Sequence, residues 1–231
     1  MVKPIEYRYE LKFLISEAVA ALLKQQLKAV MQLDSHSVSE EYSYDIRSLY
    51  FDDTYSSAYR EKVNGEEFRR KYRIRMYNND PSFISLECKH KDENMTYKES
   101  CKLSQQVAKA LINKQYLRVH SANRFLNKFL REAVSRNLSP SIIVDYRRTA
   151  FTYPVSEVRI TFDEDLRSGR NDLDLFNENM NTFAMYPDGV CVLEVKCNEF
   201  IPQHILSILN SVPKLRQAVS KFAVCRSIKE A

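Results

Sequence analysis

Two stretches of the sequence place charged residues two positions apart, which is the spacing of side chains on one face of a β-strand. In each stretch, an arginine-bearing run is followed by a run containing Glu-x-Lys. The residues are Arg73, Arg75, Glu87 and Lys89 within 68–91, and Arg159, Glu194 and Lys196 within 157–197. Arginines bind phosphate oxygens through a forked guanidinium, lysines act as point charges, and carboxylates supply oxygen ligands for divalent cations. The pattern therefore favours phosphate chemistry.

An ordinary antiparallel strand with one face in water shows the same alternation. The intervening residues Ile74, Cys88, Ile160 and Val195 are expected on the opposite, apolar face in either case. The recurrence of the charged pattern in both halves of the chain favours a functional site over a solvated surface.

Composition limits the kinds of phosphate site that the chain can build. The 231 residues include only 3 glycines, and no GxxxxGK[ST] or GxGxxG motif occurs, so the backbone cradle of a Gly-rich loop is excluded. The net charge of +5 indicates an anionic partner. Motifs of RNA-binding domains are absent and the basic residues form no continuous block, so nucleic acid is not expected.

The five cysteines lack the spacing of zinc sites and are expected to be reduced thiols, which predicts a cytoplasmic protein. The N-terminal run has no apolar signal core, and no apolar run approaches the length of a membrane span.

Alternating and helical patterns predict an α+β fold: an eight-stranded antiparallel β-barrel with flanking and inserted helices. We expect one domain over 1–231, with a helical insertion at about 103–137 and C-terminal helices at about 202–228. Asn64-Gly65 is typical of a two-residue hairpin turn. Lys214 to Ile228 is expected to form one closing helix with Ser220 and Lys221 inside it.

If the polar faces point into the barrel, its interior collects seven cations and three carboxylates. These residues are Glu10, Lys12, Arg73, Arg75, Glu87, Lys89, Arg148, Arg159, Glu194 and Lys196. Such a set cannot be buried dry, because isolated charges are costly in a low dielectric. The excess of cations fits a ligand with several phosphates.

Six segments together resemble the VTC domain, the polyphosphate polymerase branch of the triphosphate tunnel metalloenzymes. They are SLYFDDTYSSAYREKVNGEEFRRKYRIRMY, SLECKHK, IIVDYRRTAF, EVRITFDEDL, VLEVK and SKF, in that order. The similarity extends from Tyr9 to Phe222. It implies an eight-stranded tunnel that transfers the γ-phosphate of ATP onto a growing polyphosphate chain, with Mn²⁺ or Mg²⁺ as cofactor. A membrane-protein partner that receives the product is a further expectation, and the oligomeric state is left open.

The resemblance also implies roles for individual residues. Catalytic contacts to the phosphates fall on Arg73, Arg75, Lys89, Arg148, Arg159 and Lys196. Substrate binding falls on Lys12, Tyr146, Ser220 and Lys221, and metal binding on Glu194, with Glu87 and Glu10 as further candidates. Glu87 is either a second metal ligand or a partner that orients Lys and Arg, and Glu10 is either a ligand or a partner of Arg8 or Lys12.

The first strand departs from the Glu-x-Glu-x-Lys motif with which many tunnel hydrolases and cyclases begin. Here the run is Arg8-Tyr9-Glu10-Leu11-Lys12, so arginine replaces the first acid. This exchange favours phosphate binding and the polymerase branch. The alternatives are a tunnel hydrolase or cyclase acting on a short triphosphate, and a non-catalytic binder of polyphosphate or another polyanion.

Overall fold

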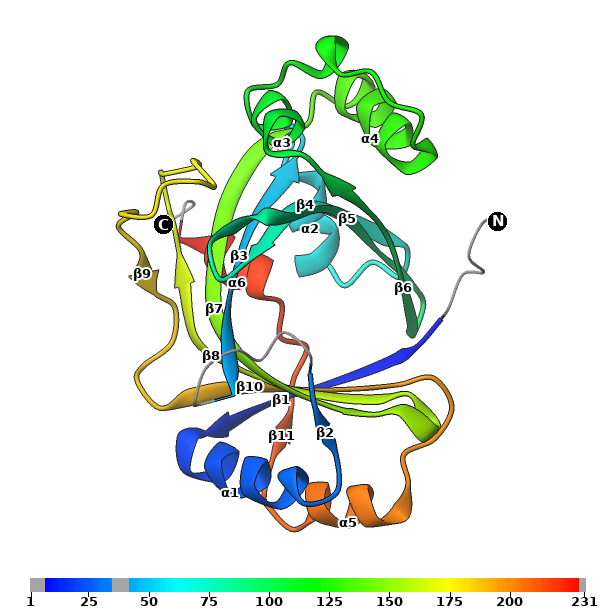
Figure 1. Cartoon of the computed structure of the whole chain (residues 1–231), viewed down its shortest axis with the longest axis vertical. Helices are drawn as coiled ribbons and strands as arrows, with labels where there is room; N and C mark the ends of the chain where they lie inside the picture. The colour runs from blue at the N-terminus through cyan, green and yellow to red at the C-terminus, as the bar shows by residue number, and fades with distance from the viewer. Residues whose placement is uncertain (1–6, 35–41, 229–231) are drawn as a thin grey trace. The chain divides into compact units, whose positions relative to one another are not determined.

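The computed structural model describes residues 7–34 and 42–228. Within them lie six α-helices and eleven strands, eight of which are at least eight residues long. The long strands are β1 (Tyr9–Ser16), β3 (Ser43–Asp52), β4 (Arg69–Tyr77), β5 (Asp80–Asp92), β6 (Met95–Leu103), β7 (Ser139–Tyr153), β8 (Val158–Ser168) and β10 (Val190–Cys197). The other three, β2 (Gln32–Leu33), β9 (Phe183–Ala184) and β11 (Leu215–Arg216), have two residues each. The predicted antiparallel, strand-rich α+β class is confirmed (Figure 1).

Hydrogen-bonded neighbours follow the order β11-β1-β10-β8-β7-β3-β4-β5-β6, with β2 beside β7 and β9 beside β8. In the described part of the chain this path has two ends, so closure into an eight-stranded barrel is not confirmed.

The chain divides into two compact units, each assembled from three segments. Unit 1 comprises 1–45, 146–166 and 184–219, and unit 2 comprises 46–145, 167–183 and 220–231. Strands β3, β7 and β8 contribute residues to both units. The expectation of a single domain stays a prediction.

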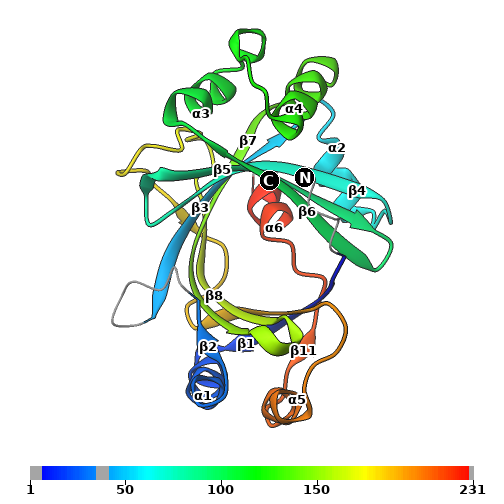
Figure 2. The same ribbon diagram turned by 45° about the vertical axis from the view of Figure 1, so that its right-hand side comes forward.

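Unit 1 packs helices α1 (Glu17–Lys28) and α5 (Gln203–Asn210) against one face of its strands (Figures 1 and 2). Ser16 begins α1 as its N-cap and accepts a hydrogen bond from the Val19 amide at 3.3 Å. Leu23 and Leu27 of α1 and Ile205 of α5 are buried in a core with alternate residues of β1, β8 and β10.

Unit 2 packs α3 (Gln105–Ile112) and α4 (Arg124–Ser135) against one face of β4, β5 and β6. A 3₁₀ turn, η1 (Tyr116–Arg118), lies between these helices, and η2 (Pro154–Ser156) follows β7 in unit 1. Asn123 is the N-cap of α4 and accepts hydrogen bonds from the amides of Phe125 and Leu126. Phe129 of α4 is fully buried against Tyr72 and Phe51.

Two local predictions were wrong. Asn64-Gly65 is not a hairpin turn: Asn64 is the C-cap of α2 (Ser57–Val63), and Gly65 has a φ of +76° just beyond it. Asn and Gly favour both contexts, and a helix end also uses the left-handed conformation. The closing helix is shorter than expected, because α6 spans only Lys221–Ser227 and β11 and an irregular segment precede it. Ser220 is its N-cap, and accepts a hydrogen bond from the Ala223 amide.

None of the helices in the described ranges has both the length and the apolar character needed to cross a bilayer.

Candidate functional site: a charged face in each unit

The charged residues lie on the strand faces opposite the two apolar cores. Ile160 and Val195 belong to the core of unit 1, and Ile74 and Cys88 to that of unit 2, as the alternation predicts. The charged residues between them are nevertheless buried: the exposed fraction is 5% for Arg75, 2% for Glu87, 6% for Arg148 and 4% for Glu194. A solvated strand face would leave such side chains in water, so that interpretation is excluded for these four.

In unit 1, opposite charges face each other across β1 and β10. The register places Glu10 opposite Lys196, and Lys12 opposite Glu194. Lys12 Nζ lies 3.2 Å from Glu194 Oε1 and 3.9 Å from a carboxylate oxygen of Glu10. Lys196 Nζ lies 3.3 Å from Glu194 Oε2 and 3.7 Å from Glu10 Oε1. Each lysine therefore contacts both carboxylates, an arrangement in which cross-strand pairs of opposite charge stabilise the sheet.

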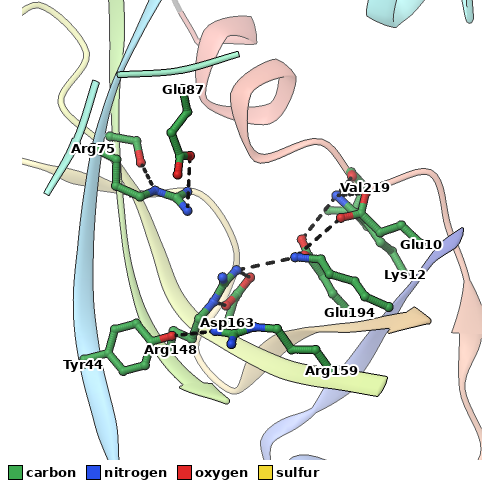
Figure 3. A network of polar contacts seen from close by, with 12 residues as sticks. Glu10, Lys12, Tyr44, Arg75, Glu87, Arg148, Arg159, Asp163, Glu194 and Val219 are labelled. Carbon is green, nitrogen blue, oxygen red and sulfur yellow. Dashed lines mark hydrogen bonds and ion pairs between the residues drawn. The ribbon is translucent and has the colours of Figure 1, made fainter. Parts of the chain in front are cut away.

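Burial shifts the pKa of Lys196. It lowers this pKa to about 7, although the charges of Glu194 and Glu10 favour the ammonium form. Lys12 is held in addition through a hydrogen bond from Nζ to the Val219 carbonyl oxygen at 3.1 Å (Figure 3).

Arg148 on β7 forms a forked ion pair with Asp163 on β8 (Figure 3). The Nε–Oδ1 and Nη2–Oδ2 distances are 2.5 and 2.7 Å. Burial alone would lower the pKa of Arg148, but Asp163 raises it well above the usual value, so the guanidinium stays charged. Arg148 also lies 4.0 Å from Glu194 Oε2 and 5.2 Å from the ring centroid of Tyr146.

Arg159 lies opposite Lys196 in the register of β8 and β10. Its guanidinium pairs with Asp34. It also donates a hydrogen bond to the Tyr44 hydroxyl at 3.1 Å (Figure 3). Unit 1 thus brings together Glu10, Lys12, Tyr146, Arg148, Arg159, Glu194 and Lys196 from the predicted set.

In unit 2, Glu87 on β5 is surrounded by cations. Arg73 Nε and Nη2 lie 2.7 and 2.5 Å from Glu87 Oε2, and Lys98 Nζ lies 2.8 Å from Oε1. Arg75 Nη1 is 3.9 Å from the same carboxylate, and its Nε donates to Ser48 Oγ at 3.0 Å. Burial would raise the pKa of Glu87, but the charges of Arg73, Arg75 and Lys98 hold it well below its usual range.

The same face carries a row of three lysines on neighbouring strands. Lys71 is opposite Lys89 across β4 and β5, and Lys89 is opposite Lys98 across β5 and β6. By strand alternation, eight cations share this face of the described β4–β6 sheet with one carboxylate, Glu87. The cations are Arg69, Lys71, Arg73, Arg75, Lys89, Lys91, Lys98 and Lys102. Like charges directly opposite one another are destabilising, so the face is suited to an anionic ligand.

The predicted C-terminal pair also belongs to unit 2. Ser220 Oγ lies 3.3 Å from Lys71 Nζ, which is also 5.5 Å from the ring centroid of Phe222. Lys221 is buried at the first position of α6.

These features agree with a comparison to known families. The family model of the VTC domain matches residues 7–228. The chain belongs to the VTC domain family. A search of curated proteins found no match.

Solved structures resemble the VTC domain over most of its length. A Bacillus halodurans protein proposed to be an adenylate cyclase is 14% identical, with a TM-score of 0.50 and coverage of 90% of this chain and 88% of the other. The PH1819 protein of Pyrococcus horikoshii OT3 is 10% identical, with a TM-score of 0.48 and coverage of 97% and 99%. The first of these shows a shared fold and nothing about activity.

The carboxylates of the VTC domain differ in their fitness to hold a divalent cation. Glu10 and Glu194 contact the same two lysines, and Mg²⁺-like ions commonly bind through one or two carboxylates together with substrate phosphates. This donor set fits such an ion. Glu87 accepts hydrogen bonds of 2.5 to 2.8 Å from Arg73 and Lys98 on its two oxygens, whereas Lys12 and Lys196 lie 3.2 to 3.9 Å from the oxygens of Glu10 and Glu194. The tighter contacts favour the second predicted role of Glu87, that of orienting Lys and Arg. Among the described residues, no group of three or more His, Cys, Asp or Glu side chains has the arrangement of a metal site.

Sequence reasoning missed several residues of these faces. Asp163 follows Arg159 at a spacing of four on β8, so strand alternation could have placed it on the same face. Lys71 precedes Arg73 by two residues and could have been found in the same way. Asp34 carried no such signal, because its partner Arg159 is 125 positions away in the sequence. Lys98 is opposite Lys89 in the next strand, and only the register of β5 and β6 shows that it reaches Glu87.

Proposed function

We propose that this VTC domain is a metal-dependent polyphosphate polymerase that transfers the γ-phosphate of ATP onto a growing polyphosphate chain. The observation that carries the proposal is the face of β4–β6, on which eight cations accompany a single carboxylate. A polyphosphate chain bears negative charge along its whole length and can therefore contact cations along the whole face. A single phosphate would neutralise only the cations near it and leave the others repelling one another.

The charged face of unit 1 supports binding of a triphosphate. Arg148 is held rigidly by Asp163, so its remaining N–H groups are oriented before a phosphate arrives. Lys12 and Lys196 can transfer their interactions from the carboxylates to phosphate oxygens. Glu194 and Glu10 would then hold a Mn²⁺ or Mg²⁺ ion, which would neutralise charge on the same phosphates.

Phosphoryl transfer requires mainly positioning and neutralisation of charge, with little covalent chemistry from the protein. The acceptor in polymer growth is a terminal phosphate oxygen that is already ionised, so the reaction needs no strong general base. The face of β4–β6 suits that requirement, since its eight cations outnumber its single carboxylate, Glu87.

Arg8 favours the polymerase over a hydrolase. It occupies the position of the first acid of Glu-x-Glu-x-Lys, and its charge contributes to lowering the pKa of Lys196. Its Nε is buried and has no hydrogen-bond partner in the described part of the chain. An anionic ligand would satisfy it, whereas a carboxylate at this position would have offered a metal ligand.

The test is to incubate the purified protein with ATP and Mn²⁺ and to resolve the products on a gel. We expect a ladder of polyphosphate chains. Release of free phosphate alone would identify a triphosphate hydrolase, cyclic AMP a cyclase, and binding of polyphosphate without turnover a non-catalytic binder. Each of these three results would overturn the proposal.

Two variants test whether the charged residues are needed for activity rather than for folding. Arg75→Ala and Lys196→Ala are expected to abolish the ladder while leaving circular dichroism unchanged. Arg60→Ala, an exposed residue of α2, is the matched control and should retain activity. Full activity of either site variant would remove its residue from the mechanism. The membrane-protein partner, the cytoplasmic location and the tunnel remain predictions.

A further inference from the structure

Positive charge is concentrated in the helical segment of unit 2. Residues 102–136 contain eight Lys and Arg residues and one acid, Glu132, which is a net charge of +7. The whole chain has a net charge of only +5, so the other residues together are slightly acidic. The segment comprises α3, η1 and α4 with their flanking residues.

The cations of this segment fall into two groups. Four contact other parts of unit 2. Lys128 pairs with Glu99, and Arg136 pairs with Asp53. Lys102 and Lys109 lie over the rings of Phe83 and Phe176. The others are Lys114, Arg118, Arg124 and Arg131, which are exposed and make no ion pair within residues 7–34 and 42–228. We call these four residues, together with Leu117, the basic patch. Arg124 and Arg131 are seven positions apart in α4, so they lie on one face of the helix.

Leu117 distinguishes the basic patch from an ordinary solvated surface. It lies in η1 beside Arg118, and 82% of its side chain is exposed. The segment between α3 and α4 protrudes beyond both helices in the two views of Figures 1 and 2. Val134 of α4, three positions from Arg131, is also 51% exposed. Apolar side chains thus stand among unpaired cations.

We propose that the basic patch docks the protein onto an anionic lipid bilayer, with Leu117 entering the headgroup region. Clustered cations attract acidic lipids, and an apolar side chain at a protruding turn can bury its surface in the boundary between headgroups and acyl chains. A free polyanion such as nucleic acid or polyphosphate would use the cations but would leave Leu117 exposed to water. The combination therefore favours a lipid surface.

The basic patch is distinct from the charged strand faces. Its residues are on α4, on η1 and in the turn that follows α3, and α3 and α4 pack on the apolar face of β4–β6. The cations of Arg73, Arg75 and Lys89 lie on the other face of these strands. Loss of lipid binding should therefore leave polyphosphate synthesis unchanged in solution, so failure of this inference and failure of the proposed function can be told apart.

The experiment is flotation of the full chain with vesicles of phosphatidylcholine, with or without phosphatidylglycerol. We expect binding only to vesicles that contain phosphatidylglycerol, and weaker binding as salt is raised. Removal of each cation should weaken binding by roughly fivefold. The double variant Arg124→Glu with Arg131→Glu should lose at least about 25-fold.

The matched control is Arg60→Glu with Arg216→Glu, which changes the net charge equally at exposed residues outside the basic patch. It should keep more affinity for the vesicles than the patch variant. Equal losses in the two variants would show that only net charge matters, and would overturn the assignment.

Leu117→Ser tests whether the ligand of the basic patch is a bilayer or a soluble polyanion. It should weaken vesicle binding by about tenfold or more and leave the binding of long-chain polyphosphate and of duplex DNA unchanged. If Leu117→Ser has no effect on vesicles, or if the patch variant loses polyphosphate or DNA binding instead, the bilayer is not the partner. Equal binding to neutral vesicles would also contradict the proposal.

Discussion

Lys12 and Glu194 face each other directly across β1 and β10, with 3.2 Å between Lys12 Nζ and Glu194 Oε1. The same carboxylate contacts Lys196 through its other oxygen. Glu194 therefore contacts two lysines of the predicted phosphate site and is itself the predicted metal ligand.

Glu194→Gln should lower polyphosphate synthesis by roughly 100-fold, because the amide loses the negative charge that attracts both the cation and the lysines. Gel assays over a Mn²⁺ titration should show that more metal is needed for the residual activity. Glu164→Gln changes a carboxylate that pairs with Lys24 and should retain the wild-type metal dependence. An unaltered Mn²⁺ requirement in Glu194→Gln would contradict its role as a ligand.

Asp163→Asn should reduce the free energy of unfolding by about 3 kcal/mol, because it leaves the buried Arg148 without its charged partner. Urea denaturation followed by circular dichroism measures the loss. Glu164→Gln, at the next position, breaks a more exposed pair and should cost under about 1 kcal/mol. Similar losses in the two variants would show that the Arg148–Asp163 pair contributes no more than a surface ion pair.

Lys89→Gln should weaken the binding of polyphosphate by about tenfold and leave stability unchanged or raised by about 0.5 kcal/mol. The central lysine of the row Lys71–Lys89–Lys98 is removed, so repulsion across the three strands falls. Fluorescence anisotropy with labelled polyphosphate and thermal unfolding measure the two effects. Lys28→Gln, on the exposed end of α1, is the control for net charge. Equal loss of polyphosphate affinity in the two variants would argue against a binding role for the row.

Stability should fall as the pH decreases below about 6.5, partly because of His90. Burial lowers the pKa of His90, and the hydrogen bond between His90 and Glu99 opposes this shift only in part. The positive charges of Lys128 and Arg70 lower the pKa further. The unfolded chain then binds a proton at a pH where the folded chain does not. The free energy of unfolding therefore decreases from pH 6.5 towards the pKa of folded His90, by less than about 1.4 kcal/mol per pH unit.

His90→Gln should flatten this part of the profile. Urea denaturation between about pH 5 and pH 7.5 measures the slope. His120→Gln, which alters an exposed histidine, should keep the wild-type slope. If His90→Gln retains the wild-type slope, another group is responsible for the pH dependence.

Much of the fold followed from local patterns. The eight long strands were predictable from alternation, and the helices α1, α3 and α4 from apolar spacing. Local patterns failed at Asn64-Gly65 and at the closing helix. The same residue types serve a hairpin and a helix end, and a helical apolar pattern does not show where a helix begins.

The charged strand faces can be read from the amino-acid sequence, because a two-residue period assigns each side chain to a face regardless of the partner strand. The sequence also carries the motifs of the VTC family in order along the chain. Which charges meet depends instead on how the strands pair in the folded protein. Strand register places Glu10 beside Lys196, Lys12 beside Glu194 and the three lysines in one row, and the pairing of strands distant in the sequence sets that register. Burial of Glu87, Arg148 and Glu194 likewise depends on packing and not on local spacing.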